Sequence, residues 1–168
     1  IEAENFLCGG EGVTHHDSDS INFGNSPYRV VDAPGVDLRV NPTGSSSNNI
    51  ELGWTLAGEW LDYGINVSQT RFYDITIRAS AAVNNASFRL LLDGVQLGAV
   101  TQVPNTGNIN TYQNLSVPAV MMTQGNHTLR LEIVNGGANY DYIQMQNAVG
   151  PVIQFSAPTY TVNENGVN

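Results

Sequence analysis

The fold class is decided by the stretch Ser87-Phe88-Arg89-Leu90-Leu91-Leu92-Asp93-Gly94-Val95-Gln96-Leu97-Gly98-Ala99-Val100. Two apolar runs of strand length flank the pair Asp93-Gly94. Such a pair accommodates the two positive-φ positions that a tight two-residue hairpin turn needs. The sequence therefore predicts an antiparallel hairpin with strands over residues 87–92 and 95–100.

Further strand signals lie on both sides of this hairpin. Residues 72–79 alternate around β-branched side chains, as a half-buried strand does. Short segments with strand composition follow, separated by turns rich in Gly and Asn: 111–115, 117–120, 127–133 and 139–145. No segment shows sustained helical periodicity. Evenly spaced short strands predict an all-β protein, an antiparallel β-sandwich of the jelly-roll type.

The chain of 168 residues is long enough for one buried core. We expect one module over residues 1–147 and, over 148–168, a linker with the start of a following β-repeat domain. Residues 152–166 resemble the opening strand of a Calx-beta repeat, and the chain does not begin with Met, so a piece of a larger multimodular protein is expected. Residues 32–49 are rich in Pro, Gly, Ser and Asn and predict a long exposed loop.

Charge is sparse and acidic: 12% of residues are charged, the net charge is −9, and all six cations are Arg. A chain without a basic patch gains nothing from counterion release, so no nucleic-acid partner is expected. No apolar run is long enough to cross a bilayer, so no membrane partner is expected either. The negative field repels anionic polymers and favours a neutral ligand. Cys8, the only cysteine, is expected to be a buried or half-buried thiol.

The opening residues Ile1-Glu2-Ala3-Glu4 place two carboxylates on one face of a predicted strand. Like charges at this spacing repel unless a cation lies between them. Carboxylate oxygens supplemented by backbone carbonyls suit Ca²⁺ rather than Zn²⁺. The alternative is that Glu2 and Glu4 face solvent on a charged edge strand.

Residues 52–63 contain both tryptophans of the chain, Trp54 and Trp60, with no catalytic group beside them. An indole ring can bury the apolar C–H face of a pyranose at low entropic cost. The amide of Asn139 carries a donor and an acceptor and can bridge neighbouring hydroxyls. The alternatives are that Trp54 packs in the core and that Asn139 is a turn residue.

Taken in order, six motifs resemble family 6 carbohydrate-binding modules over residues 1 to about 147. They are residues 1–5, 27–29 with 36–38, 53–63, 103–107, 125–131 and 136–143. The resemblance implies a non-catalytic β-sandwich jelly roll that carries a structural Ca²⁺ and is usually attached to a glycoside hydrolase. It also implies a ligand cleft at the loop end (cleft A) and, in some members, a second cleft on one sheet (cleft B).

Carried over residue by residue, the resemblance places Trp54 and Asn139 in cleft A. The position of the family's second aromatic residue is held by Ile109, so binding is weaker or another aromatic, Tyr28, supplies the second face. The resemblance also places His16 and Asp17 on a loop lining this cleft; a second metal site over residues 15–19 is the alternative.

Two further residue sets follow from the same resemblance. Trp60 would border cleft B, but the acidic partner that some members have falls at Leu91, which favours a packing role for Trp60. The remaining Ca²⁺ ligands would be the carbonyl of Arg29, with Asn49 as alternative, and a group near Gln146.

We therefore expect a monomeric, secreted bacterial module that binds a neutral β-glucan, xylan or agar-type polysaccharide and targets an attached hydrolase. One alternative is a calcium-dependent adhesion module that contacts another protein. The other is a small jelly-roll glycosidase, which needs a carboxylate pair in the cleft. Asp17 and Asp141 are the candidates for such a pair, but nothing in their sequence context suggests a tuned pKa, so an enzyme is not expected.

Overall fold

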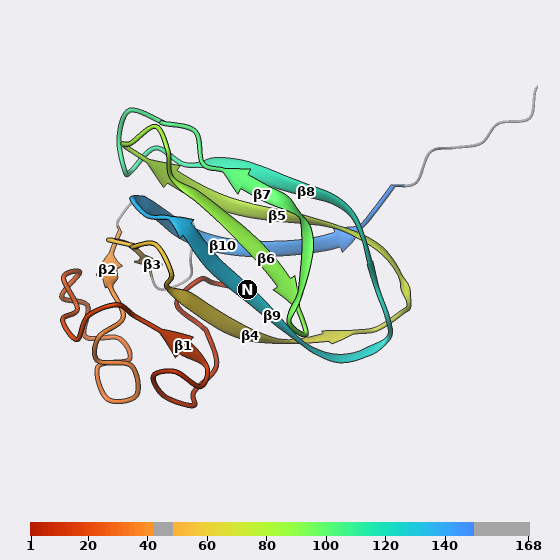
Figure 1. Ribbon diagram of the computed structural model, residues 1–168, viewed down its shortest axis with the longest axis horizontal. Coiled ribbons are helices and arrows are strands. Elements are labelled where there is room, and N and C mark those ends of the chain that lie inside the picture. Colours follow the sequence, from red (N-terminus) through yellow and green to blue (C-terminus); the bar gives the residue numbers. More distant parts are fainter. Residues whose placement is uncertain (42–48, 150–168) are drawn as a thin grey trace, which may run out of the picture.

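The computed structural model describes residues 1–41 and 49–149, which form two five-stranded antiparallel sheets packed face to face (Figure 1). The first sheet has the order β1-β4-β9-β6-β7 and the second the order β2-β3-β10-β5-β8. The described residues contain no helix, and hence none long and apolar enough to cross a membrane. The strands are β1 (His15–His16), β2 (Leu38–Val40), β3 (Ile50–Leu52), β4 (Trp60–Val67), β5 (Arg71–Ala81), β6 (Ser87–Leu92), β7 (Val95–Gln102), β8 (Gln113–Met122), β9 (Gly125–Asn135) and β10 (Ala138–Asn147). The predicted all-β sandwich is confirmed.

The predicted hairpin is β6-β7, paired from Leu92 and Val95 outward. Its turn residues Asp93 and Gly94 have φ values of 49° and 82°. Both lie in the left-handed region, which matches the right-handed twist of the flanking strands. The turn is also bonded to β9: the Asp93 N–H donates to the Thr128 carbonyl at 2.9 Å, and the Thr128 N–H donates to the Asp93 carboxylate at 2.8 Å.

The core lies between the sheets and is built by alternation along the long strands. Side chains at every second position of β5 and β9 are fully buried, among them Ile75, Ile77, Leu129 and Leu131. A buried aromatic pair, Phe88 of β6 and Tyr140 of β10, joins the two sheets edge to face at 5.8 Å. Period-2 burial of this kind leaves the polar face of each strand outside.

The predicted loop over residues 32–49 is only partly a loop. It contains β2, and Ala33, Val36 and Leu38 are buried. The alternation of Val36 and Leu38 with polar residues is enough to pair this segment with β3 once tertiary packing is available. Residues 42–48 lie outside the described part, as do residues 150–168 with the whole of the Calx-beta resemblance.

The first 37 residues form turns and loops around β1 at one end of the sandwich (Figure 1). Arg29 holds them together: its guanidinium donates to the carbonyls of Glu4, Phe6 and Leu7 and lies 3.7 Å over the Phe6 ring. Cys8, expected to be buried or half-buried, is exposed in this loop region, with its Sγ 3.3 Å from Arg29.

Candidate functional site

Trp54 lies in the connection between β3 and β4, and 45% of it is exposed. Its φ of 45° is in the left-handed region, which a bulky residue adopts only where its surroundings impose it. Beside the ring is a hollow of about 180 Å³, lined by Trp54, Ile109, Gly137 and Asn139. The predicted exposed indole and loop-end cleft are therefore present.

The backbone around Trp54 is fixed by the turn between β9 and β10. The Gly137 N–H donates to the Thr55 carbonyl at 2.8 Å, and the Thr55 hydroxyl donates to the Ala138 carbonyl at 2.7 Å. Gly136 is pressed against the same segment, since a Cβ at this position would lie 2.1 Å from the Thr55 carbonyl oxygen. The backbone that follows Trp54 is thus held by contacts with this turn.

We expect Gly136→Ala to push residues 54–56 away from the turn, because neither backbone can yield without breaking these bonds. Overpacking of this kind costs about 1–3 kcal/mol, or a fall in melting temperature of about 2–12 °C. Gly64→Ala is the control, since its Cβ would meet only the flexible end of Leu7 at 3.3 Å. Equal melting temperatures for the two variants, measured by calorimetry, would contradict the role given to Gly136.

The opposite wall of the hollow is aliphatic. Ile109 is half-buried on the loop between β7 and β8, and its carbonyl accepts a hydrogen bond from the Ser80 hydroxyl of β5 at 2.5 Å. This bond fixes the loop on the second sheet. The hollow therefore has one aromatic wall and one aliphatic wall.

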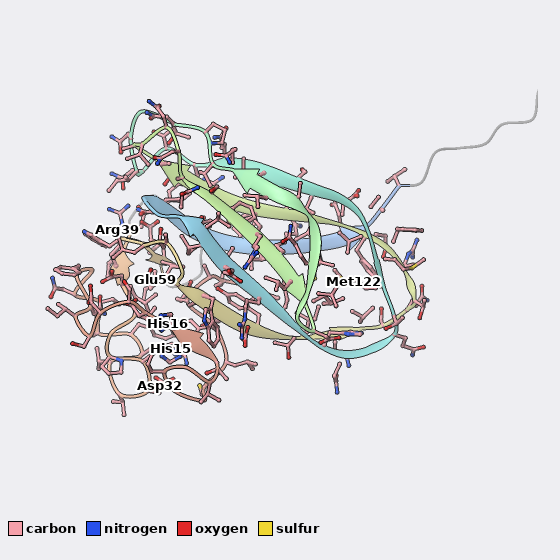
Figure 2. All side chains as sticks on the ribbon, viewed as in Figure 1. His15, His16, Asp32, Arg39, Glu59 and Met122 are labelled. Carbon is pink, nitrogen blue, oxygen red and sulfur yellow. The ribbon has the colours of Figure 1, made fainter. Side chains whose placement is uncertain are left out.

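Asn139 is 5% exposed at the start of β10, and its Nδ2 donates to Oε1 of Glu51 at 2.9 Å. Glu51, on β3, is fully buried and also accepts hydrogen bonds from Arg39 and from Asn41, the latter at 2.6 Å. Burial raises the pKa of Glu51, and the Arg39 charge and the amide donors oppose this shift. The ion pair with Glu51 neutralises the charge of Arg39. Figure 2 labels Arg39 at the end of the sandwich where β2 lies.

Sequence reasoning missed Glu51 and Arg39. The signal was present, because a carboxylate inside the apolar run 50–52 of a chain with few charges calls for a buried partner. The guanidinium of Arg39 also lies 6.0 Å from the Trp54 ring centroid.

Three predicted cleft residues lie elsewhere among the described residues. Tyr28 lines a separate hollow of about 570 Å³ and its hydroxyl donates to Asn5, so it is not a second wall beside Trp54. The polar groups of that hollow are engaged within the protein, including the Arg29–Asp32 pair. His16 is paired with Glu11 in the loop before β1.

Asp17, the third of these residues, is buried in a cluster with Asp37 and Glu59 rather than in the wall of the hollow. Burial raises the pKa of Asp17 to about 7, with the neighbouring carboxylates adding to the shift, and burial raises the pKa of Asp37 to about 6. Glu59 accepts hydrogen bonds from the Ser18 hydroxyl and the Leu56 N–H.

This cluster predicts the pH dependence of stability. A folded-state pKa above the ordinary aspartate value of about 4 means that the native state binds more protons, so stability falls as the pH rises from about 4 through about 7. We expect a loss on the order of 2 kcal/mol between pH 5 and pH 8, and a smaller loss in Asp17→Asn. Denaturant titrations of both proteins at the two pH values test this; identical pH slopes would refute the assignment to Asp17.

The opening residues, predicted to be a strand that carries the calcium ligands Glu2 and Glu4, form only an isolated bridge at Glu2 and then a turn at Ala3 and Glu4. The Ile1 amine and carbonyl exchange hydrogen bonds with Ile143 of β10, and the Ala3 N–H donates to the Asp141 carbonyl at 2.9 Å. Glu4 is fully buried, and Oε2 of Glu2 is buried without a hydrogen-bond partner in the described part of the chain. Burial raises the pKa of Glu2; the N-terminal ammonium opposes this shift, and the Asp141 charge adds to it.

Buried acidic oxygens of this kind fit a hard cation. No three His, Cys, Asp or Glu side chains within residues 1–41 and 49–149 are grouped so as to hold a metal alone, so carbonyl oxygens would have to complete the shell. Arg29 lies against the same segment, and its carbonyl accepts the Ala33 N–H at 2.9 Å. Gln146 is exposed and lies opposite Asp74 of β5 in the sheet. The N-terminal segment runs antiparallel to β10, with Glu2 opposite Tyr142, so Glu4 lies farther along the chain from Gln146.

Comparison with known proteins identifies the family to which the chain belongs. The family model described as carbohydrate binding module (family 6) matches residues 20–147. The chain belongs to this family. It is therefore a carbohydrate-binding module, from a family whose members are binding rather than catalytic modules.

Two solved family 6 modules resemble this one. The C-terminal module of a marine laminarinase from Zobellia galactanivorans is 25% identical, covers 88% of this chain and 97% of its own, and gives a TM-score of 0.65. A β-1,3-glucan-binding module from Bacillus halodurans is 16% identical, covers 87% and 93%, and gives 0.61, which shows the shared fold. An alpha-agarase from Alteromonas agarilytica is 26% identical over 93 residues, and this chain spans 6% of its length.

In this carbohydrate-binding module the ring of Trp60, expected to border cleft B, is covered. The Arg130 guanidinium lies 3.5 Å over the Trp60 centroid and is held there by two hydrogen bonds to Asp62, at 2.7 and 2.8 Å. This geometry favours the packing role for Trp60 that the sequence suggested.

Proposed function

We propose that this module binds a neutral polysaccharide in cleft A, with one sugar unit stacked on Trp54 and hydrogen-bonded to Asn139. The proposal rests on the exposed indole of Trp54 beside the polar side chain of Asn139. A flat apolar ring and an amide match the C–H face and the hydroxyls of a pyranose. Arg39, the cation that lies near the ring in the described part of the chain, is neutralised by Glu51, which supports a neutral ligand rather than a sulfated or carboxylated one.

The substrate class is proposed from the same geometry and the relatives. A laminarinase module and a β-1,3-glucan-binding module are among the similar structures, and an alpha-agarase is a relative. We place β-glucan first, with xylan and agar-type polymers as the other candidates. A glycan array of neutral and sulfated algal and plant polysaccharides tests this; binding restricted to sulfated polymers would refute the neutral-ligand proposal.

We further propose that the module targets an attached glycoside hydrolase to insoluble substrate, raising the effective concentration of enzyme at the surface. Fusion to a β-glucanase should speed hydrolysis of insoluble glucan and leave the rate on soluble oligosaccharides unchanged. Equal acceleration on both substrates would contradict targeting. Secretion by a bacterium and a monomeric state belong to the same proposal, checked by activity in the culture medium and by light scattering.

A structural Ca²⁺ held by Glu2, Glu4 and the Arg29 carbonyl is also proposed. The buried carboxylate of Glu4 and the buried Oε2 of Glu2, with Asp141 adding negative charge beside Glu2, support it. When bound, the ion would neutralise these charges and join the N-terminal segment to β10.

A further inference from the structure

Glu51 determines which atom of the Asn139 amide faces the ligand. Its carboxylate receives donors from three places: Arg39 of β2, Asn41 just after β2, and Asn139 of β10. An ionised carboxylate only accepts hydrogen bonds, so the Asn139 atom that meets it at 2.9 Å must be the nitrogen Nδ2. The Arg39 guanidinium pairs with this buried carboxylate and favours its charged form.

The other amide atom, Oδ1, is then the atom of Asn139 nearest to Gly53, the residue before Trp54. A Cβ added to Gly53 would lie 3.2 Å from Oδ1, which places this oxygen at the foot of the Trp54 segment. Within residues 1–41 and 49–149 no donor reaches it. Asn139 lines the hollow, so Oδ1 is an acceptor available beside the Trp54 ring.

We propose that Glu51 is a positioning residue that makes cleft A an acceptor site, so that the sugar unit on Trp54 must donate a hydroxyl hydrogen to Asn139 Oδ1. This inference rests on the proposed function of the same cleft. A unit that carries an ether oxygen at this point, as an O-methylated or anhydro sugar does, cannot donate. It would bury Oδ1 unpaired, and sites built for a hydrogen bond reject such analogues strongly.

The first test needs no ligand. Nuclear magnetic resonance of the Asn139 side-chain amide should show hydrogen exchange about tenfold faster in Glu51→Gln than in the wild type, because the bond to a charged acceptor is lost. Glu132→Gln is the control, since Glu132 and its partner Arg89 both lie on the first sheet, whereas Glu51 lies on the second. An Asn139 amide that exchanges equally in both variants overturns the inference.

The second test measures selectivity with laminaritriose and its per-O-methylated form. The wild type should prefer the free hydroxyls by at least about tenfold, and Glu51→Gln should lose most of this preference. Glu51→Asp, which keeps the carboxylate, should retain part of it. An unchanged preference in a folded Glu51→Gln overturns the inference.

Two outcomes separate this inference from the proposed function. If laminaritriose does not bind the wild type, the β-glucan proposal fails and the amide exchange alone decides the role of Glu51. If Glu51→Gln does not fold, the wild-type Asn139 amide is compared with that of Asn105, which donates to the neutral amide oxygen of Asn84 at 2.9 Å. Exchange no slower at Asn139 than at Asn105 overturns the role of Glu51.

Discussion

Replacing Trp54 with alanine is expected to abolish retardation of the protein in native gels that contain β-glucan. The exposed ring offers the largest apolar contact in the hollow, and its loss leaves the aliphatic Ile109 wall and the Asn139 amide. Removing an aromatic anchor of this kind costs on the order of 2 kcal/mol or more, which weakens binding by at least about 30-fold.

Two aromatic residues outside the cleft serve as controls. Phe72, on β5, is 49% exposed, and Phe72→Ala matches the loss of an exposed ring. Trp60→Ala removes the ring beneath Arg130. Both variants should be retarded as the wild type is, provided that their melting curves show folded protein. Equal losses in all three variants, or none, would refute the assignment of binding to Trp54.

Removal of Ca²⁺ is expected to lower the melting temperature by about 5–10 °C. A ligand that binds only the native state at 100 times its dissociation constant adds about 2.7 kcal/mol to stability, and about 1 kcal/mol shifts the melting temperature of a domain of this size by about 2–4 °C. Calorimetry with and without a chelator measures the effect.

The matched variants for this measurement are Glu4→Gln and Glu132→Gln. Glu4→Gln should melt at one temperature whether or not the chelator is present, because a proposed carboxylate ligand is missing. Glu132→Gln should keep the wild-type response to the chelator. A wild-type melting temperature that does not respond to chelation would remove the metal proposal, and the buried charge of Glu2 and Glu4 would then need another explanation.

The sandwich and its long strands could be predicted because their signals are local. The Asp93-Gly94 pair and the alternation along β5 and β9 can be recognised from neighbouring residues in the sequence. β2 was missed because three residues of moderate strand propensity form a strand only when β3 supplies the partner.

The candidate site was predictable only where a residue belongs to a motif of the sequence. Trp54, Ile109 and Asn139 follow from motif order, and the structure brings all three to one hollow. Tyr28 could not be excluded from the sequence, since its position depends on how the loops before β2 close on Asn5. Glu51 meets Asn139 across 88 residues of chain, and such a contact is set by tertiary packing rather than by local pattern.

The most direct test of the central claim uses Trp60→Phe, in which Trp54 is the only indole. Its fluorescence is recorded while laminaritriose is added, and binding is measured in parallel by calorimetry. We expect a saturable change in Trp54 emission with the same dissociation constant as the calorimetric titration, because the sugar covers the ring. Calorimetric binding without any change in Trp54 emission would contradict it.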